Sequence, residues 1–583
     1  MNRVSDHIFR VLRDKFGDVP AFTVAGGGNM YLLDALKVSD TKVVCCHHEQ
    51  ACAMGAVSYT KLTNKPSLVI PTTGCAGTNT ITGLLDAWQD SIPVIFISGQ
   101  VNANQTCFGS KAKLRKFGVQ EADIVSVVKP LTKYATTVLD PTTVRYHFEK
   151  AIHECLDGRY GPVWLDIPLD VQRAEVDWDS LQSYTAPPKS ESIRYDFSFL
   201  KGKNRPVIIA GNGIRLSGAK SLLNEVSRTL NIPVVSTYLG ADLMSETPSN
   251  YIGTIGVKGS RAGNFAVNNA DLVISVGSSL SVAATGYRPD HFAREAELVV
   301  VDIDSEEHSK GTVDIDHLIL DDCCNFLKGM LSEDLEFSKW LSTCQRWSEN
   351  WVVKPQDEED SEVDLYTFIN ALDSGSSSGS VIIGDAGSAF YVPCQSLKSI
   401  DKFELVVPGS QAEMGFTLPA CIGASIARPR SNIIGITGDG SFQMNIQELE
   451  TLRYLNSNVK LFVWNNGGYL SIRNTQDKFF KGRRLGSCED SGVTLPSTEK
   501  IANAYGIPYI RINNTGECIK NINSILELKG PIIVEVMCKV SQAIQPTLGV
   551  QVSEGGISSK PLEDMDPPLP RDEFYKEMII PPL

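Results

Sequence analysis

Asp439 lies between two glycines, and Asn466 follows it at the end of the next apolar run. The segments GDG (438–440) and NNGGY (465–469) are separated by 24 residues. A carboxylate, an amide oxygen and a nearby backbone carbonyl, here that of Gly468, suit a hard divalent cation. Mg²⁺ commonly takes one or two such protein ligands and completes its shell with phosphate oxygens and water. The flanking glycines would let the backbone approach such phosphates closely.

A strand, a helix and a second strand are needed to bring these side chains together. NIIGITGDG (432–440) predicts a buried strand that ends at the aspartate, and VKLFVW (459–464) predicts the next strand. Asn445 is predicted to cap the helix between them, with Glu448 completing a capping box. The apolar face of that helix would consist of Ile446, Leu449, Leu452 and Leu455.

Such a strand–helix–strand crossover returns Asn466 to the sheet edge that holds Asp439. Open parallel sheets bind ligands at that edge. Each short segment alone is also typical of an ordinary turn, but their combination at this spacing favours a metal site.

A second candidate is Glu49, in CCHHEQACAMGA (45–56). It follows a predicted strand and begins a helix of small residues. Taken alone, a glutamate at this position is most simply a favourable partner of the helix dipole.

The GDG and NN segments resemble the thiamine diphosphate motif shared by acetolactate synthase, pyruvate decarboxylase and their relatives, and the resemblance covers nearly the whole chain. It implies that Asp439, Asn466 and the Gly468 carbonyl hold Mg²⁺, which bridges the cofactor diphosphate to the protein. Gly440 and Ser441 would belong to the cofactor site.

The same resemblance assigns a catalytic role to Glu49. Its segment is similar to RHEQ of acetolactate synthases, with His47 where the family often has arginine. The family glutamate protonates the pyrimidine ring of the cofactor, and a buried carboxyl with a raised pKa can share a proton at neutral pH.

Further segments fit the same family. QAEMGFTLPACIGA (411–424) resembles MGFGLPAAIGA and places Met414 under the bend of the cofactor, although a methionine also fills core gaps readily. GDAGSAF (384–390) offers Gly387 and Ser388 as donors to the diphosphate, or else forms an ordinary turn.

In the N-terminal part, TTGCAGTNTITGLLDAWQDSIPVIFISGQV (72–101) resembles the family loop near the pyrimidine. The cofactor-binding residues predicted there are Gly26, Gly74 and Asn79. FGVQEADIVSVVKPLTKYA (117–135) resembles the segment that carries a glutamine near the substrate, here Gln120, which is assigned a catalytic role.

The fold class expected is α/β, because short β-branched runs alternate with polar helical segments. By resemblance, we expect three doubly wound parallel-sheet domains: a pyrimidine-binding domain (1–180), a central Rossmann-like domain (195–345) and a diphosphate-binding domain (362–540). A polar linker (183–196) and an acidic stretch (354–364) separate them. The tail (541–583), rich in proline and glycine, is expected to pack irregularly.

The middle part departs from the family. Acetolactate synthases hold a structural FAD there, contacted by an arginine, and Ala283 of VGSSLSVAATGY (276–287) takes that position here. Lys258 and Arg261 are close enough in sequence to substitute. FAD is therefore an open question, with absence the expected outcome.

Bulk properties exclude several classes. The 583 residues carry a net charge of -14, with a pI near 5.2, which argues against broad binding to nucleic acid or to an anionic membrane. No apolar run reaches the length of about 18 residues that a membrane span requires. The 14 cysteines show no zinc-like spacing, and with no signal peptide they predict a reduced, cytoplasmic protein. No P-loop motif occurs.

The resulting interpretation is an enzyme that requires thiamine diphosphate and Mg²⁺ and acts on a 2-oxo acid, with pyruvate favoured. The SGQV, HEQ and MGF segments favour transfer of the remaining fragment to a second carbonyl, which makes the enzyme an acetolactate synthase-like transferase or lyase. That acceptor could be a second pyruvate, another aldehyde or a keto-sugar. Two competing interpretations are a simple 2-oxo acid decarboxylase and a non-catalytic scaffold or regulator. The resemblance implies a homodimer or homotetramer.

Overall fold

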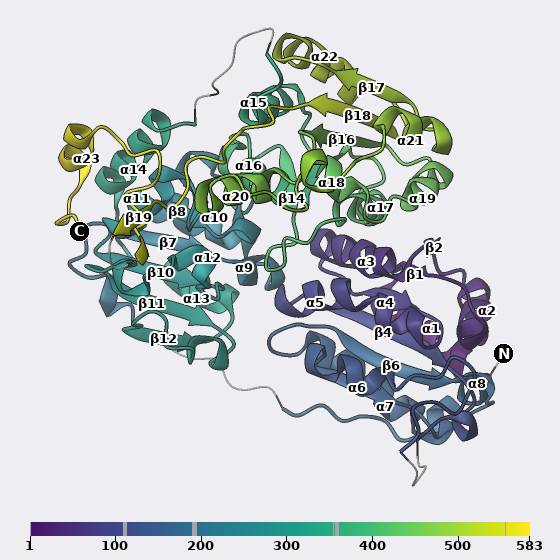
Figure 1. Ribbon diagram of the computed structural model, residues 1–583. Helices are drawn as coiled ribbons and strands as arrows, with labels where there is room; N and C mark the ends of the chain where they lie inside the picture. Colours follow the sequence, from purple (N-terminus) through teal and green to yellow (C-terminus); the bar gives the residue numbers. More distant parts are fainter. Residues whose placement is uncertain (1, 109–112, 189–194, 354, 356–360, 554–555) are drawn as a thin grey trace.

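The computed structural model describes residues 2–108, 113–188, 195–353, 355, 361–553 and 556–583. Parts of the predicted linker (189–194) and of the acidic stretch (354 and 356–360) lie outside these residues. Within the described chain, three six-stranded sheets follow one another, and every strand pair in them is parallel. The predicted α/β class with three parallel-sheet domains is confirmed (Figure 1).

The N-terminal sheet has the order β2-β1-β3-β4-β6-β5. Its strands are β1 (Ala21–Thr23), β2 (Val43–Cys45), β3 (Ser67–Ile70), β4 (Val94–Gln100), β5 (Tyr134–Thr137) and β6 (Val163–Pro168). The helices around it are α1 (Val4–Phe16), α2 (Met30–Val38), α3 (Glu49–Thr63), α4 (Cys75–Asn79), α5 (Ile81–Gln89), α6 (Ile124–Val128), α7 (Val144–Leu156) and α8 (Leu169–Arg173).

The central sheet has the order β12-β11-β10-β7-β8-β9. Its strands are β7 (Pro206–Ala210), β8 (Val234–Ser236), β9 (Tyr251–Thr254), β10 (Leu272–Val276), β11 (Glu297–Asp302) and β12 (His317–Leu320). Its helices are α9 (Asn212–Leu216), α10 (Lys220–Leu230), α11 (Arg261–Asn268), α12 (Val282–Thr285), α13 (Cys323–Met330) and α14 (Ser338–Asn350).

The C-terminal sheet has the order β14-β13-β15-β16-β18-β17. Its strands are β13 (Ser380–Gly384), β14 (Phe403–Val406), β15 (Ile433–Gly438), β16 (Val459–Asn465), β17 (Tyr509–Ile512) and β18 (Ile532–Met537). Its helices are α15 (Leu365–Gly375), α16 (Ser388–Ser396), α17 (Thr417–Ala427), α18 (Asp439–Phe442), α19 (Glu448–Leu455), α20 (Leu470–Phe480), α21 (Thr498–Tyr505) and α22 (Thr515–Glu527). The three domain ranges stay predictions, and each sheet lies within one of them.

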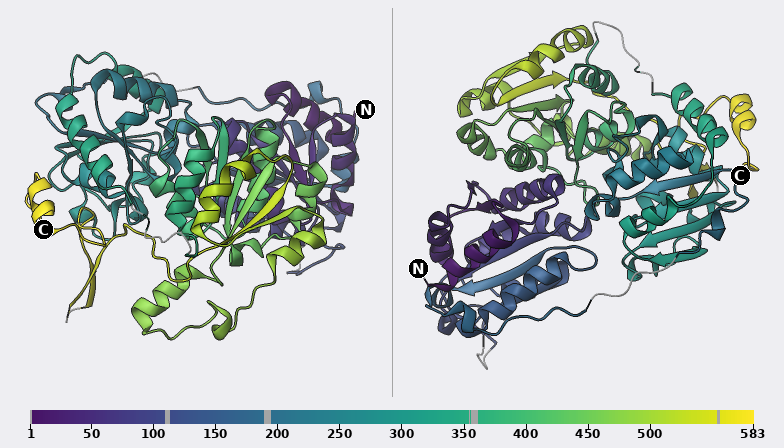
Figure 2. Two further views of the ribbon diagram at one scale, coloured as in Figure 1. Left: turned by 90° about the horizontal axis from the view of Figure 1, so that it is seen from above. Right: turned by 180° about the vertical axis from the view of Figure 1, so that it is seen from behind.

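The N- and C-terminal domains share one hydrophobic core. Helix α3 packs along α17 (Figures 1 and 2). Buried residues of both helices, such as Met54 and Ile422, belong to the same cluster. Central strands of both sheets are apolar on both faces, as parallel sheets covered by helices require. The carboxyl edges of the two sheets are therefore fixed relative to each other.

The tail is more regular than expected. It forms an antiparallel pair of strands, β19 (Val550–Ser553) and β20 (Gly556–Ser559), followed by α23 (Arg571–Glu577). Figure 1 shows it in yellow against the central domain. Arg261 and Arg294 of that domain hold it, because Arg261 donates to the Met565 carbonyl and Arg294 pairs with Glu563 at 2.7 Å. Among the described residues, no helix has both the length and the apolar character needed to cross a bilayer.

Candidate active site

The turn after β15 and the loop after β16 meet at one sheet edge. The two strands pair in parallel, with Gly438 opposite Trp464. Oδ2 of Asp439 accepts the backbone N–H groups of Asn466, Gly467 and Gly468 at 3.1, 2.8 and 3.0 Å. The expected convergence of Asp439 with the Asn466–Gly468 loop is therefore present in the fold.

The donor set at this edge fits a hard divalent cation. Oδ1 of Asn466 is buried and, within the described part of the chain, has no hydrogen-bond partner. A buried amide oxygen without a partner costs free energy unless a ligand satisfies it. Burial raises the pKa of Asp439 against the effect of its backbone hydrogen bonds, and a bound cation would favour its ionised form. Asn466, Asp439 and the nearby Gly468 carbonyl thus match the preference of Mg²⁺ for oxygen ligands.

Buried Arg473 holds the Asn466–Gly468 loop through its backbone carbonyls. Its guanidinium donates to the carbonyls of Asn466 and Gly467 at 2.7 and 2.9 Å. Gly468 itself has φ = 127°, and a Cβ there would lie 2.4 Å from the Ser487 carbonyl. Only glycine fits this position, which explains the glycine of the NNGGY segment.

Neighbouring strand β13 ends at the same edge. Gly387 caps α16 with φ = 58°, and Ser388 is its first residue, so both predicted diphosphate donors follow the strand that pairs with β15. A Cβ on Gly440 would lie 2.2 Å from the Tyr469 ring, which explains the second glycine of GDG.

Ser441 connects this edge to the loop that carries Met414. Its hydroxyl donates to Oδ2 of Asp385 at 2.6 Å and accepts the N–H of Gly415 at 2.8 Å. Burial raises the pKa of Asp385. The sequence interpretation missed Asp385, although the GD pair at 384–385 repeats the GD pair at 438–439 on the adjacent strand.

The predicted N-terminal residues collect at the carboxyl edge of the first sheet. Glu49 is the first residue of α3, shortly after β2. Its Oε2 accepts a hydrogen bond from Nδ2 of Asn79 at 2.9 Å. Gly74 has φ = 68°, and a Cβ there would lie 2.3 Å from the carbonyl of Gln120, so this pair is also in contact. Gly26 follows neighbouring strand β1 and packs against Thr72.

No hydrogen bond or ion pair among the described residues joins Glu49 to the Asp439 cluster. Near Glu49, the hydrogen bonds between the two domains instead come from residues that follow the GDG turn. The predicted capping box is wrong, because α19 begins at Glu448 and Asn445 has φ = 66°. Asn445 donates to Gln50 and to the Gly415 carbonyl, each at 3.0 Å, and the Glu448 side chain accepts N–H groups next to Glu49. Long-range partners thus replace the local cap.

A cavity of about 1000 Å³ opens at the carboxyl edge of the central sheet, and residues of all three domains line it. Ala283 is among the lining residues, whereas Lys258 and Arg261 are not. Lys258 lies 4.9 Å from the centre of the Tyr391 ring, and Arg261 is bonded to the tail. Neither cation compensates for the arginine that Ala283 replaces.

The cations that do line this cavity already have partners. Arg159 pairs with Asp304 at 3.1 Å and with Glu307 at 2.5 Å, and Lys310 pairs with Glu307 at 2.7 Å. Nζ of Lys133 donates to the Asp157 carbonyl. A dinucleotide diphosphate needs cationic or backbone donors, and the cationic side chains that line this cavity, being paired already, do not fit the diphosphate of FAD.

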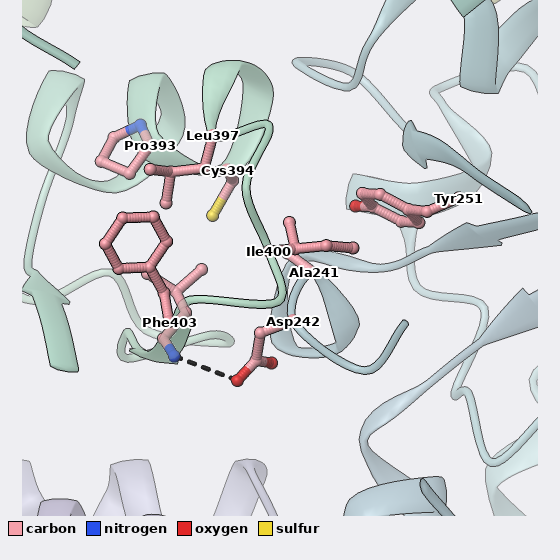
Figure 3. Close-up of a pocket in the computed structure, with 9 residues that line it drawn as sticks. Ala241, Asp242, Tyr251, Pro393, Cys394, Leu397, Ile400 and Phe403 are labelled. Atoms are coloured by element: carbon pink, nitrogen blue, oxygen red, sulfur yellow. Dashed lines mark hydrogen bonds between the residues drawn. The ribbon is translucent and has the colours of Figure 1, made fainter. Parts of the chain in front are cut away.

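A second cavity, of about 10 Å³, lies between the central domain and β14. Figure 3 shows Asp242 at its rim, where the carboxylate accepts the Leu405 N–H at 3.0 Å. Burial opposes ionisation of Asp242, but the charge of Arg215 lowers its pKa overall. Such a volume holds about one water molecule, so this junction is structural.

Three family descriptions match successive parts of the chain. "Thiamine pyrophosphate enzyme, N-terminal TPP binding domain" matches residues 2–126. "Thiamine pyrophosphate enzyme, central domain" matches residues 197–330. "Thiamine pyrophosphate enzyme, C-terminal TPP binding domain" matches residues 385–536. Each match includes strands of one of the three sheets.

Similar proteins span nearly the same length. The acetolactate synthase large subunit of Cyanidium caldarium is 30% identical over 553 residues, which cover 90% of this chain and 92% of that protein. The acetolactate synthase large subunit of Lactococcus lactis subsp. lactis (strain IL1403) is 30% identical, with coverage of 90% and 91%. The acetolactate synthase isozyme 2 large subunit of Escherichia coli (strain K12) is 29% identical, with coverage of 93% and 96%.

Proposed function

The chain belongs to the thiamine pyrophosphate enzyme family, and from this premise we propose that it uses thiamine diphosphate and Mg²⁺ to decarboxylate a 2-oxo acid, with pyruvate as the favoured donor. The remaining fragment is transferred to a second carbonyl, as the names of the similar acetolactate synthases indicate for those proteins. Bound thiamine diphosphate supplies a nucleophilic carbon and an electron sink.

One observation carries this proposal. The buried Asn466 Oδ1 has no partner in the described chain, and it lies on the loop whose N–H groups bind Asp439. A purely structural turn would satisfy this oxygen internally. A metal-bridged diphosphate accounts for both the free oxygen and the acidic side chain beside it.

In the proposal, the C-terminal domain binds the metal and the diphosphate of the cofactor. Asp439, Asn466 and the Gly468 carbonyl hold the metal, while Gly387, Ser388 and Gly440 lie near the diphosphate. Met414 supports the bend of the cofactor.

In the N-terminal domain, Glu49 shares a proton with the pyrimidine nitrogen and Asn79 orients its carboxyl group, since the Asn79–Glu49 hydrogen bond is 2.9 Å long. Gly26 and Gly74 shape the neighbouring loops, and Gln120 faces the substrate. Because Glu49 has no described contact with the metal cluster, we propose that two chains of a homodimer complete each site.

The test is incubation of the purified protein with a panel of 2-oxo acids, thiamine diphosphate and Mg²⁺. We expect CO₂ release from pyruvate and a carboligation product identified by mass. Asp439→Ala should weaken cofactor binding in calorimetry, because it removes a charged metal ligand.

An aldehyde as the sole product would identify a simple decarboxylase. Absence of both cofactor binding and CO₂ release would overturn the proposal in favour of a non-catalytic homologue.

A further inference from the structure

Glu448 of the C-terminal domain is fully buried and reaches across to the N-terminal domain. Its Oε1 accepts the backbone N–H groups of His47 and His48 at 2.9 and 3.0 Å. These two peptide groups directly precede Glu49, the proposed catalytic residue. The contact therefore joins residues about 400 positions apart in sequence at the start of α3.

The second carboxylate oxygen of Glu448 is also bonded. Oε2 accepts the hydroxyl of Thr451 at 2.7 Å, and that hydroxyl lies 3.0 Å from Nδ1 of His47. Burial raises the pKa of Glu448, while the hydrogen bonds from Thr451 and from the two peptide groups favour the ionised form. A buried carboxylate with this many donors is a rigid anchor, because breaking any bond leaves it incompletely satisfied.

The anchor acts on the backbone that aims the Glu49 side chain. Helix α3 begins at Glu49, and Nδ1 of His48 accepts the Gln50 N–H at 3.2 Å to cap it. A carboxylate at this helix end is also favoured by the helix dipole. Glu49 is thus held through its preceding peptide groups by Glu448 and at its tip by Asn79.

A second bond supports the same contact. Asn445 donates to Oε1 of Gln50 at 3.0 Å. Asn445 and Glu448 both lie in the segment that follows the GDG turn and α18. This segment therefore contacts the start of α3 on both sides of Glu49 in the sequence.

We propose that Glu448 is a positioning residue for Glu49: it fixes the start of α3 so that the Glu49 carboxyl group meets the pyrimidine ring in the geometry that proton transfer needs. This inference rests on the proposed function, because it assumes that Glu49 acts on thiamine diphosphate. A displacement of about 1 Å at a reacting group can cost about 10²-fold in rate.

The first test uses the protein without cofactor. Amide hydrogen exchange should show the His47 and His48 N–H groups protected in the wild type and at least tenfold less protected in Glu448→Ala. Glu448→Gln keeps an acceptor oxygen in place and should restore most of the protection. The matched control is Glu450→Gln, two residues away, because the partly exposed side chain of Glu450 pairs with Arg453 of its own helix. Equal protection in Glu448→Ala and in this control would overturn the inference.

The second test measures proton exchange at the reactive carbon of bound thiamine diphosphate. We expect Glu448→Ala to slow this exchange by about 10- to 100-fold, with less than threefold change in cofactor affinity and with partial rescue in Glu448→Gln. A merely structural role would lower the melting temperature and leave the exchange rate of the folded enzyme unchanged, which would overturn the inference.

If Glu448→Ala does not fold, Thr451→Val takes its place, since it removes one bond to Oε2 and leaves Glu448 intact. A two- to fivefold slowing supports the inference, and an unchanged rate overturns it. The proposed function fails separately, and visibly, if the wild type itself neither binds the cofactor nor exchanges this proton.

Discussion

Three carboxyl groups and one ammonium group share a buried site between the N- and C-terminal domains. Lys61 on α3 lies 2.8 Å from Asp90 and 3.6 Å from Asp86, and Glu413 precedes Met414 on the facing loop. Although burial opposes it, the charge of Lys61 lowers the pKa of Asp90, whereas burial raises the pKa of Asp86. A single ammonium group cannot balance three carboxylates in such surroundings, so the site must hold at least one proton.

Glu413 is the group in this site whose titration should be measurable. Both of its carboxyl oxygens are buried and, among the described residues, lack hydrogen-bond partners. Burial raises its pKa to about 7 from an ordinary 4.5, in a setting that also contains Lys61, Asp90 and Asp385. Its neutral form therefore stabilises the fold below pH 4.5, and this contribution is lost as the pH rises through about 7.

Glu413→Gln should remove this loss. We expect the difference in unfolding free energy between the variant and the wild type to increase from pH 4.5 to about pH 7 and to stay constant above that pH. The total increase should be up to about 3 kcal/mol in favour of the variant. Urea titrations across this range provide the measurement, with exposed Glu499→Gln as control. A difference that stays constant with pH would contradict the prediction.

Sequence motifs identified residues but not their distant partners. Asp439 and Asn466 could be paired in advance, because one crossover separates them and parallel topology returns both to one edge. The partners of Asn445 and Glu448 lie at the start of α3, about 400 residues away. The residues around Asn445 and Glu448 in the sequence favour a capping box, and only the packing of the two domains explains why these side chains bond to the start of α3 instead.

At the scale of elements, the crossing of α3 and α17 allows no side chain at its closest point. A Cβ on Gly423 would lie 2.0 Å from the backbone carbonyl of Gly55. The obstacle is backbone within a helix, which cannot rotate away. The two glycines thus set the distance between the helices and, through them, between the domains that carry Glu49 and Asp439.

Gly423→Ala should force these helices apart. We expect a loss of about 1–3 kcal/mol in the free energy of unfolding, the usual cost of overpacking a core. Gly375→Ala is the matched control in another helix, because there the added methyl would clash with the side chain of Asn523, whose Oδ1 would lie at 2.0 Å and can rotate aside. Equal melting temperatures of the two variants would contradict this interpretation of the crossing.

The strands predicted at 432–440 and 459–464 are present as β15 and β16, whereas β5, β9 and β12 of the three large sheets have shorter or more polar sequences that predict a strand less clearly. All three lie at the edge of a sheet. Their residues are partly exposed, as in the pattern of Tyr134–Thr137, which is intermediate throughout. An edge strand has a neighbouring strand on one side only and is more exposed, so its sequence can be less apolar, whereas the buried central strands are continuous apolar runs.

At the scale of the whole molecule, one chain carries both halves of the proposed site, one around Glu49 and one around Asp439. Glu49 contacts Asn79, and Asp439 contacts its own loop, with no bond between these groups in the described chain. The shared core of α3 and α17 fixes both halves within the chain. A second copy of the chain would bring complementary halves together, as the family resemblance implies.

Mixing two inactive variants tests this arrangement. Glu49→Gln and Asp439→Ala subunits should each be inactive alone, whereas exchanged heterodimers should recover activity, because one of their two sites contains neither substitution. Differently tagged subunits show by pull-down whether exchange has occurred. A mixture that exchanges subunits and stays inactive would mean that each chain forms its own site.

Residues of all three domains line the cavity at the carboxyl edge of the central sheet, so a flavin bound there would contact all three domains. Six of its lining residues are acidic and three are basic, and the basic ones are already bonded. Ala283 adds no charge, and Lys258 and Arg261 lie outside the lining. An unpaired diphosphate in these surroundings would be repelled, so we expect the purified protein to carry no FAD and yet to decarboxylate 2-oxo acids. Absorption spectra in the flavin region before and after denaturation provide the measurement. Release of FAD in equal amount to the chain would show that backbone donors alone hold the diphosphate and would overturn the prediction.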